Sequence, residues 1–212
     1  NVALIERKDI ISDINRACSM MVVTLTGKYL EERIQINTRD KKLCFPGYGF
    51  SINYDGPHQD FYTWSIYSYK GSKIQLGNYE ENSRTGKRVS AVYNKEALLK
   101  GLLGEACAHN VEVFNPYNVV RTVKEDGKVR VLTREGRSFT GTFVIAADGR
   151  SSRIAHTLGF NRNRHYFGTA VTMGYEMEGV EPAEKYALFQ VFLNENPSKR
   201  IWMTPRTAKD TY

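Results

Sequence analysis

The sequence predicts a mixed α/β protein that combines a parallel-sheet domain with an antiparallel β domain. Three stretches carry this prediction. Phe143–Ala147 is an apolar, β-rich run that stops at Asp148 and Gly149, which is typical of a strand buried on both faces of a parallel sheet. Residues 42–78 alternate aromatic or β-branched side chains with polar ones, a pattern that favours antiparallel strands. Lys95–Ala108 has apolar residues near helical spacing.

The composition is that of a folded chain without a transmembrane helix. Of the 212 residues, 41% are hydrophobic, which is enough for one large domain or two small ones. The chain contains no apolar run of about eighteen residues, and its N-terminus lacks the charged-then-apolar pattern of a secretory signal. We therefore expect a cytoplasmic location, and a peripheral membrane contact stays open.

The charge and the cysteine and histidine positions exclude several kinds of site. The formal net charge of +7 favours anionic partners. The basic residues are nevertheless spread along the chain, so a solvated basic surface explains them too, and no nucleic-acid partner is predicted. The three cysteines, Cys18, Cys44 and Cys107, form no CxxC pair and are expected to be reduced thiols. The four histidines lack the spacing of a metal motif, so no metal is expected.

The first stretch, Val2–Glu6, is an apolar run closed by a carboxylate and followed by Arg7. In dinucleotide-binding folds the second strand ends this way, and its acidic residue accepts hydrogen bonds from the adenosine ribose hydroxyls. Many other strands also end in glutamate, so an ordinary strand end is the alternative. The GxGxxG turn that should precede such a strand is not in this sequence. We therefore expect the chain to be an interior part of a longer protein.

The alternating pattern between Lys42 and Asn78 predicts an antiparallel sheet with one aromatic face, which includes Tyr62 and Trp64. Turns fit at residues 55–57 and 70–72. An aromatic face of this kind could line a pocket for a long apolar ligand. Since most aromatic stripes are core, an ordinary sheet core is the alternative.

The next stretch predicts a helix followed by a β-meander. Asn94 is placed to cap the helix at Lys95–Ala108, and His109 with Asn110 would end it. A short strand is expected at Val111–Phe114. The meander would contain three strands, Val119–Lys124, Val129–Thr133 and Phe139–Thr142, joined by turns at Asp126-Gly127 and Glu135-Gly136.

The end of the meander feeds into the strand that stops at Asp148. Ser151 and Ser152 can then cap a helix whose apolar residues include Ile154. A carboxylate at the carboxyl end of a parallel strand lies where open α/β sheets bind ligands. An ionised carboxylate only accepts hydrogen bonds, so Asp148 suits a ribose or ribitol chain better than a phosphate. An ordinary strand-to-helix turn is the alternative, because Asp-Gly is common in turns.

The motif ADGRSS at residues 147–152 resembles the ADGxxS motif of FAD-dependent oxidoreductases that share the para-hydroxybenzoate hydroxylase fold. The resemblance implies a partial Rossmann-like FAD-binding domain with a β-meander, and an antiparallel β-sheet substrate domain. Asp148 and Gly149 would then lie at the ribityl part of FAD. Glu6 and Arg7 would lie at the adenosine ribose, and backbone groups at Val119 would contact the adenine.

Within this superfamily the chain resembles geranylgeranyl reductases. Arg16 and Cys18 resemble a basic residue and a cysteine loop that pass close to the flavin in that family. Trp202 and Pro205 match a degenerate form of a strand that lines the substrate cavity, to which Tyr62 and Trp64 would contribute. The resemblance divides the chain into an FAD-binding domain, residues 1–37 and 86–164, and a substrate domain, residues 38–85 and 165–212.

The activity that this resemblance implies is FAD-dependent reduction of carbon–carbon double bonds in an isoprenoid chain or another apolar substrate. Cys18 is the candidate for the acid that supplies the proton, and the electron donor would be NAD(P)H or a ferredoxin-like protein. A monooxygenase or halogenase of the same fold is the alternative, although aromatic hydroxylases carry an arginine where this chain has Ala155. An alternative of another class is a non-catalytic nucleotide-binding remnant.

Overall fold

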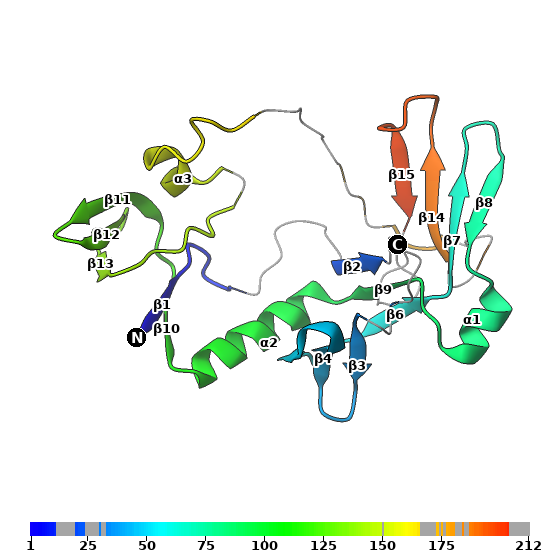
Figure 1. Cartoon of the computed structure of the whole chain (residues 1–212), viewed down its shortest axis with the longest axis horizontal. Coiled ribbons are helices and arrows are strands. Elements are labelled where there is room, and N and C mark those ends of the chain that lie inside the picture. Colours follow the sequence, from blue (N-terminus) through cyan, green and yellow to red (C-terminus); the bar gives the residue numbers. More distant parts are fainter. Residues whose placement is uncertain are drawn as a thin grey trace. The chain divides into compact units, whose positions relative to one another are not determined.

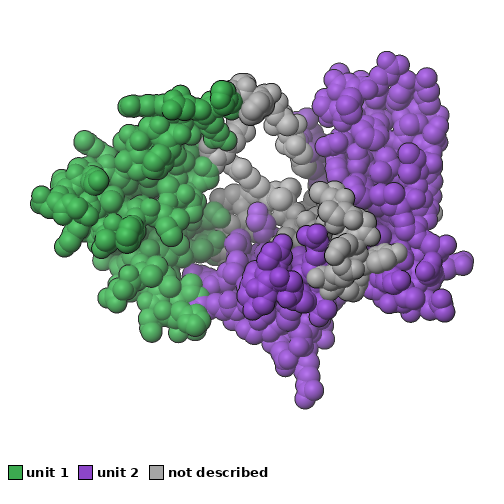
Figure 2. All heavy atoms as spheres, viewed as in Figure 1, with its two compact units in different colours: residues 1–13, 106–172 green, residues 14–105, 173–212 purple. Residues whose placement is uncertain are grey.

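The computed structural model describes residues 1–11, 20–23, 30, 33–149, 151–165, 173, 175, 177–180, 184 and 187–203. The fold is mixed α/β, as predicted, with several small sheets and few helices (Figure 1). The chain forms two compact units: unit 1 is Asn1–Asp13 with Ala106–Thr172, and unit 2 is Ile14–Glu105 with Met173–Tyr212 (Figure 2). Both units are discontinuous in sequence, and the domain boundaries expected from the resemblance stay a prediction. No helix in the described part of the chain is long and apolar enough to cross a membrane.

Unit 1 contains a parallel strand pair and a meander. Strand β1 (Val2–Ile5) pairs in parallel with β10 (Val111–Phe114). The predicted meander is confirmed as β11 (Val119–Glu125), β12 (Lys128–Thr133) and β13 (Ser138–Gly141), all antiparallel. Asp126 and Gly127 connect β11 to β12 with φ angles of 48° and 74°, values that favour the Asp-Gly sequence found there. Helix α3 (Arg153–Thr157) packs against β11.

The expected buried strand at Phe143–Ala147 is not present. Residues 143–149 belong to no strand, and the side chains of Phe143 and Ile145 are 89% and 90% exposed. A parallel strand buried on both faces needs neighbouring strands and covering elements. Among the strands that the structure describes, β1 pairs only with β10, and none pairs with residues 143–147. The apolar run has the composition of a buried strand, but its burial depends on partners that the described residues do not supply.

Unit 2 contains three small sheets where the sequence pattern predicted one between residues 42 and 78. The first has the order β2 (Met20–Val23), β9 (Ser90–Tyr93) and β6 (His58–Phe61). The second has the order β3 (Gln35–Asn37), β4 (Lys42–Phe45) and β5 (Phe50–Asn53), with the turn η2 (Pro46–Tyr48) between the last two. The prediction of a single aromatic sheet is therefore wrong. The alternating segments are strands, but they pair with different partners.

The third sheet of unit 2 has the order β15 (Arg200–Met203), β14 (Ala187–Phe192), β7 (Thr63–Tyr67) and β8 (Lys73–Leu76), and Figure 1 shows its two hairpins side by side. Strand β14 pairs with β7 in parallel, so distant segments of the sequence form one sheet. Helix α1 (Tyr79–Thr85) follows β8 and was not predicted. Its cap is Asn78, whose side-chain oxygen accepts a hydrogen bond from the Glu81 backbone N–H at 3.1 Å.

Helix α2 (Lys95–Ala108) is confirmed with its predicted bounds. The Asn94 side-chain oxygen accepts a hydrogen bond from the Ala97 backbone N–H at 2.9 Å, and Asn110 ends the helix region with a φ of 59°. Ala97 and Leu98 pack on the main apolar core of unit 2, whose buried members are Leu30, Ile34, Leu43, Tyr54, Ala91 and Tyr93. The first turns of the helix therefore contact this core, and further along Glu105 Oε1 accepts a hydrogen bond from the Asn53 backbone N–H at 2.6 Å.

Replacement of Asn94 by alanine is expected to lower the free energy of unfolding by about 1 kcal/mol, because an N-cap side chain satisfies a backbone donor that otherwise has no partner. Urea unfolding followed by far-UV circular dichroism would measure the change. Asn94→Asp keeps the acceptor and should unfold like the unmodified protein. An equal loss in both variants would contradict a capping role.

Candidate functional site

The end of strand β1 is held against the loop that leads into the meander. The Glu6 backbone N–H donates to the Phe114 carbonyl at 3.0 Å, and the Tyr117 backbone N–H donates to the Glu6 carbonyl at 2.8 Å. Val119, the first residue of β11, lies two residues further along. Two residues that sequence reasoning placed at the adenosine end of a nucleotide, Glu6 and Val119, therefore lie in one corner of unit 1.

The Glu6 carboxylate is half-buried and oriented by its own loop. Its Oε1 accepts hydrogen bonds from the Arg7 backbone N–H at 2.9 Å and the Lys8 backbone N–H at 3.0 Å. The Asn115 side-chain amide fixes the same loop, since it donates to the Asp9 carbonyl at 2.6 Å. A carboxylate can also accept hydrogen bonds from ligand hydroxyls. The Arg7 side chain is exposed beside it.

Asp148 anchors the turn that leads into α3. Its Oδ2 accepts a hydrogen bond from the Ile154 backbone N–H at 3.3 Å, while Ser152 caps the helix through the Ala155 N–H at 2.9 Å. Burial acts to raise the pKa of Asp148, but hydrogen bonds from the Ser152 hydroxyl and the Ile154 N–H outweigh it, so the pKa is lowered. Gly149 has a φ of 84°, and no atom of the described residues lies within 4 Å of the place a Cβ would take. The carboxylate is ionised and exposed, next to an open stretch of backbone.

A shallow hollow of about 420 Å³ lies beside α3, and sequence reasoning did not predict it. Its lining is polar apart from one valine: Val120, Ser151, Ser152, Arg153, His156, Thr157 and Asn161. Neither Glu6 nor Asp148 lines it, so the hollow is not the place where those two carboxylates would meet a ligand. The signal that could have indicated it is the run of hydroxyl and basic side chains at residues 151–157.

Trp64 and Trp202, two of the predicted substrate residues, come together on the sheet of unit 2. Their ring centroids are 5.6 Å apart, with the ring planes inclined at 39°. They reach across β14, where Gln190 pairs with Trp202. Trp64 is 9% exposed and its Nε1 has no hydrogen-bond partner among the described residues, whereas Trp202 is 39% exposed. The Arg200 guanidinium lies over the Trp202 ring at 5.3 Å.

The other predicted residues are not part of this tryptophan pair. Tyr62 makes an edge-on contact with Tyr79 of α1, at 6.1 Å between ring centroids. Arg16, Cys18 and Pro205 lie outside the described residues.

The opposite face of this sheet carries a polar cluster around Glu184. Ser65 and Tyr67 donate hydrogen bonds to its carboxylate at 2.8 and 2.6 Å, and the Lys73 ammonium lies at 2.6 Å. Side chains alternate along β7, so this cluster and Trp64 lie on different faces. Burial acts to raise the pKa of Glu184, but the hydrogen bonds from Lys73, Tyr67 and Ser65 outweigh it and the pKa is lowered.

The lowered pKa of Glu184 predicts a stability contribution with a definite pH dependence. The ionised form is favoured in the folded state, so the contribution is present above the unfolded-state pKa of 4.5 and is lost as the pH falls through the lower folded-state pKa. Glu184→Gln should destabilise the protein at pH 7 and should flatten the loss of stability on the acid side. Urea unfolding between pH 7 and pH 3 checks this. A difference between the two proteins that does not change with pH would contradict it.

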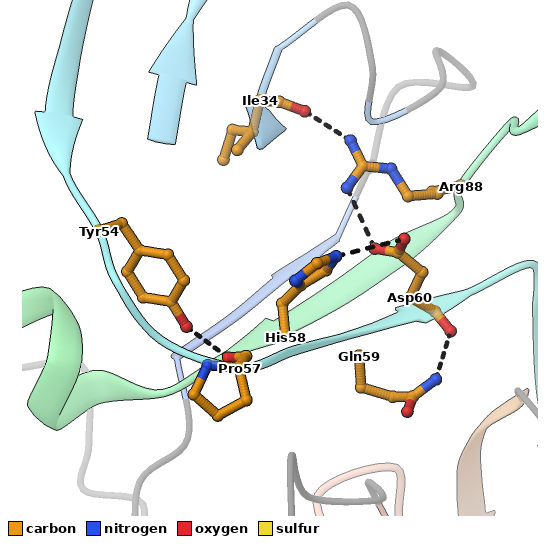
Figure 3. A network of polar contacts seen from close by, with 7 residues as sticks. All are labelled: Ile34, Tyr54, Pro57, His58, Gln59, Asp60 and Arg88. Carbon is orange, nitrogen blue, oxygen red and sulfur yellow. Dashed lines mark hydrogen bonds and ion pairs between the residues drawn. The ribbon is translucent and has the colours of Figure 1, made fainter. Parts of the chain in front are cut away.

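A buried ion pair that sequence reasoning did not nominate connects three segments of unit 2 (Figure 3). The Arg88 guanidinium contacts Asp60 Oδ1 at 3.1 Å and donates to the Ile34 carbonyl at 2.7 Å. His58 Nε2 lies 3.8 Å from Asp60 Oδ2. The adjacent Tyr93 is buried, and this burial raises its pKa to about 12. These contacts lie among β6, β9 and the residues before β3, so they support the scaffold.

Comparisons with known proteins give a family and several solved structures. A family model described as FAD binding domain matches residues 37–212. HpxO of Klebsiella pneumoniae, solved with FAD and uric acid, has 19% sequence identity and a TM-score of 0.42, over 65% of this chain and 35% of that one. FqzB has 13% identity and a TM-score of 0.45, over 64% and 32%. The chain thus spans about a third of the length of these structures. No curated protein matches the chain.

Proposed function

Because the chain belongs to the FAD binding domain family and its cofactor is FAD, we propose that the protein is an FAD-dependent oxidoreductase acting on an apolar small molecule. The observation that carries the proposal is the corner of unit 1 formed by Glu6 and the start of the meander. There the Tyr117 N–H donates to the Glu6 carbonyl at 2.8 Å, and the Glu6 carboxylate accepts hydrogen bonds from two backbone N–H groups that orient it. Bound FAD supplies the two-electron chemistry, and the protein supplies binding and orientation.

The residues of unit 1 fit the adenosine half of this cofactor. Glu6 would accept hydrogen bonds from the ribose hydroxyls, with Arg7 beside it, and the backbone at Val119 would face the adenine. Asp148 and Gly149 would hold the ribityl chain, and the described residues leave room beside Gly149 for a ligand to approach the backbone. Support for the second assignment is the ionised, acceptor-only state of Asp148.

The tryptophan pair supports an apolar or aromatic substrate. A flat, partly exposed ring at Trp202 offers a stacking surface, and the largely buried Trp64 ring packs beside it. Two reactions fit such a substrate. Membership in the FAD binding domain family favours monooxygenation, with NAD(P)H as electron donor. Ala155, which stands in α3 where aromatic hydroxylases carry an arginine, favours reduction of an isoprenoid double bond instead.

Product analysis with the full-length protein, FAD and a reductant distinguishes the two reactions. A monooxygenase consumes oxygen and adds a hydroxyl group to an aromatic compound. A reductase saturates a double bond of geranylgeranyl diphosphate, with dithionite and without oxygen. Flavin that stays bound while neither product forms across a panel of apolar compounds would contradict the oxidoreductase proposal.

Trp202→Ala is expected to raise KM for the substrate by about three- to tenfold, which is the effect of losing one aromatic stacking partner. The matched control is Ile201→Ala, because Ile201 is 46% exposed and occupies the opposite face of the same strand. Steady-state kinetics of both variants measure the difference. Equal effects from Trp202 and Ile201 would place the substrate elsewhere.

A further inference from the structure

We propose that Arg137 is a positioning residue for the adenosine half of FAD, acting through Phe114 and Tyr117 on Glu6. The proposal rests on the proposed FAD site of unit 1 and adds a residue that neither the sequence motifs nor the family match assigns.

The Arg137 guanidinium is clasped by three aromatic rings. Its central carbon lies 4.6 Å from the ring centroid of Phe114, 5.1 Å from that of Phe139 and 5.4 Å from that of Tyr117. One of its nitrogens, Nη1, donates a hydrogen bond to the Tyr117 hydroxyl at 3.2 Å. The rings also contact one another, since Phe139 is 4.8 Å from Phe114 and 5.9 Å from Tyr117 between centroids. One side chain therefore joins β10, the loop after it and β13.

The backbone of Arg137 is itself fixed to β12. The Arg137 carbonyl accepts hydrogen bonds from the Thr133 backbone N–H and hydroxyl, both at 3.0 Å. The Arg137 N–H donates to the Thr133 Oγ1 at 3.2 Å. Thr133 is buried, with 6% of its surface exposed. The guanidinium thus extends from a rigid point of the meander, although the side chain is exposed.

Two of the three rings belong to the residues that grip Glu6. The Phe114 backbone carbonyl accepts a hydrogen bond from the Glu6 backbone N–H at 3.0 Å. The Tyr117 backbone N–H donates to the Glu6 carbonyl at 2.8 Å. A guanidinium that holds both rings therefore sets the position of both backbone groups. The position of the Glu6 carboxylate therefore depends on this cluster. A displaced carboxylate would bind a ligand less tightly, because hydrogen bonds weaken steeply when their geometry is distorted.

The contacts of Arg137 are weak enough in free energy that we expect their loss to affect FAD binding more than folding. An exposed cation over aromatic rings is a modest interaction, so the loss of Arg137 should leave the meander folded. It should free the loop at residues 114–118 to shift and take Glu6 with it. The expected consequence of Arg137→Gln is FAD binding that is weaker by about fivefold.

A double-mutant cycle with Glu6 separates positioning from a general structural role. FAD affinity would be measured by flavin fluorescence on the full-length protein and on Arg137→Gln, Glu6→Gln and the double variant. Because Arg137 acts through Glu6, the double variant should bind FAD no more weakly than Glu6→Gln alone. Arg137→Lys, which keeps a cation but not the planar fork, should recover part of the affinity.

Arg130→Gln is the matched control, because Arg130 lies on the same meander and its ion pair with the exposed Glu125 at 2.7 Å does not reach the corner. It should leave FAD binding unchanged. The positioning role would be overturned if the fold-losses in FAD affinity of the two single variants multiplied in the double variant, or if Arg130→Gln lost as much affinity as Arg137→Gln. FAD binding by the unmodified protein would then still support the proposed function.

If Arg137→Gln fails to fold, Tyr117→Phe removes only the hydroxyl partner of Arg137. Its cycle with Glu6→Gln should show the same lack of additivity, and independent losses would overturn the inference. An unmodified full-length protein that does not bind FAD would overturn both the proposed function and this inference.

Discussion

Arg88→Met is expected to lower the free energy of unfolding by about 3–5 kcal/mol, the usual cost of leaving one member of a buried ion pair without its partner. The Arg88 side chain is 7% exposed, while that of its partner Asp60 is 25% exposed. The substitution also removes the donor of the Ile34 carbonyl, which accepts from Arg88 at 2.7 Å. Methionine keeps most of the side-chain volume, so packing changes little. Urea unfolding at pH 7 measures the loss.

The double variant Arg88→Met/Asp60→Leu should recover part of this stability, because no uncompensated charge is then left in the interior. Arg84→Met is the surface control. Arg84 is exposed on α1, and its replacement should change the free energy of unfolding by less than about 0.5 kcal/mol. A loss from Arg88→Met as small as that from Arg84→Met would contradict the role of Arg88 in joining β6, β9 and Ile34.

Two glycines in the same helix are expected to respond to alanine with opposite signs. A Cβ at Gly101 of α2 would lie 1.9 Å from the Asn53 carbonyl oxygen at the end of β5. The neighbour is backbone, so α2 or β5 must move. Overpacking of this kind costs about 1–3 kcal/mol, and the upper part of that range should exceed the helix-propensity gain of about 1 kcal/mol. Gly101→Ala should therefore destabilise the protein by up to about 2 kcal/mol.

Gly104 is the matched control within α2. It is exposed, and within the part of the chain that the structure describes no atom lies within 4 Å of the place a Cβ would take. Gly104→Ala should therefore stabilise the protein by about 0.5–1 kcal/mol, the intrinsic difference between the two residues in a helix. Thermal unfolding of the two variants measures both shifts. Stabilisation by Gly101→Ala would contradict the close packing of α2 on β5.

Local signals predicted the parts of the fold that need only neighbours in sequence. The Asn94 cap with the helical spacing after it predicted α2, and the Asp126-Gly127 and Glu135-Gly136 turns predicted the meander. These elements depend on backbone preferences and short-range hydrogen bonds, which the sequence carries directly. The cap of α3 at Ser152 belongs to the same class.

Long-range pairing could not be predicted in the same way. The alternation at residues 42–78 correctly indicated strands, but alternation does not say which strand pairs with which, and β14 joins β7 from more than a hundred residues away. Phe143–Ala147 has the composition of a buried strand, yet its exposure depends on neighbours. For the candidate site, the resemblance assigned Glu6 and Val119 to the adenosine end of one nucleotide, and Trp64 and Trp202 to one substrate cavity. The Arg137 cluster and the Arg88–Asp60 pair have no local signature, because each also involves residues more than twenty positions away in the sequence.

The FAD site proposed for unit 1 is tested most directly by the affinity of the full-length protein for FAD when the Glu6 charge is removed. Glu6→Gln keeps an oxygen for the Arg7 and Lys8 N–H groups but loses the charge that would bind the ribose hydroxyls, so FAD binding should weaken by about ten- to a hundredfold. Glu112→Gln, at an exposed position on β10 of the same sheet, should bind FAD like the unmodified protein. Unchanged FAD affinity in Glu6→Gln would contradict the proposal that this corner of unit 1 holds the cofactor.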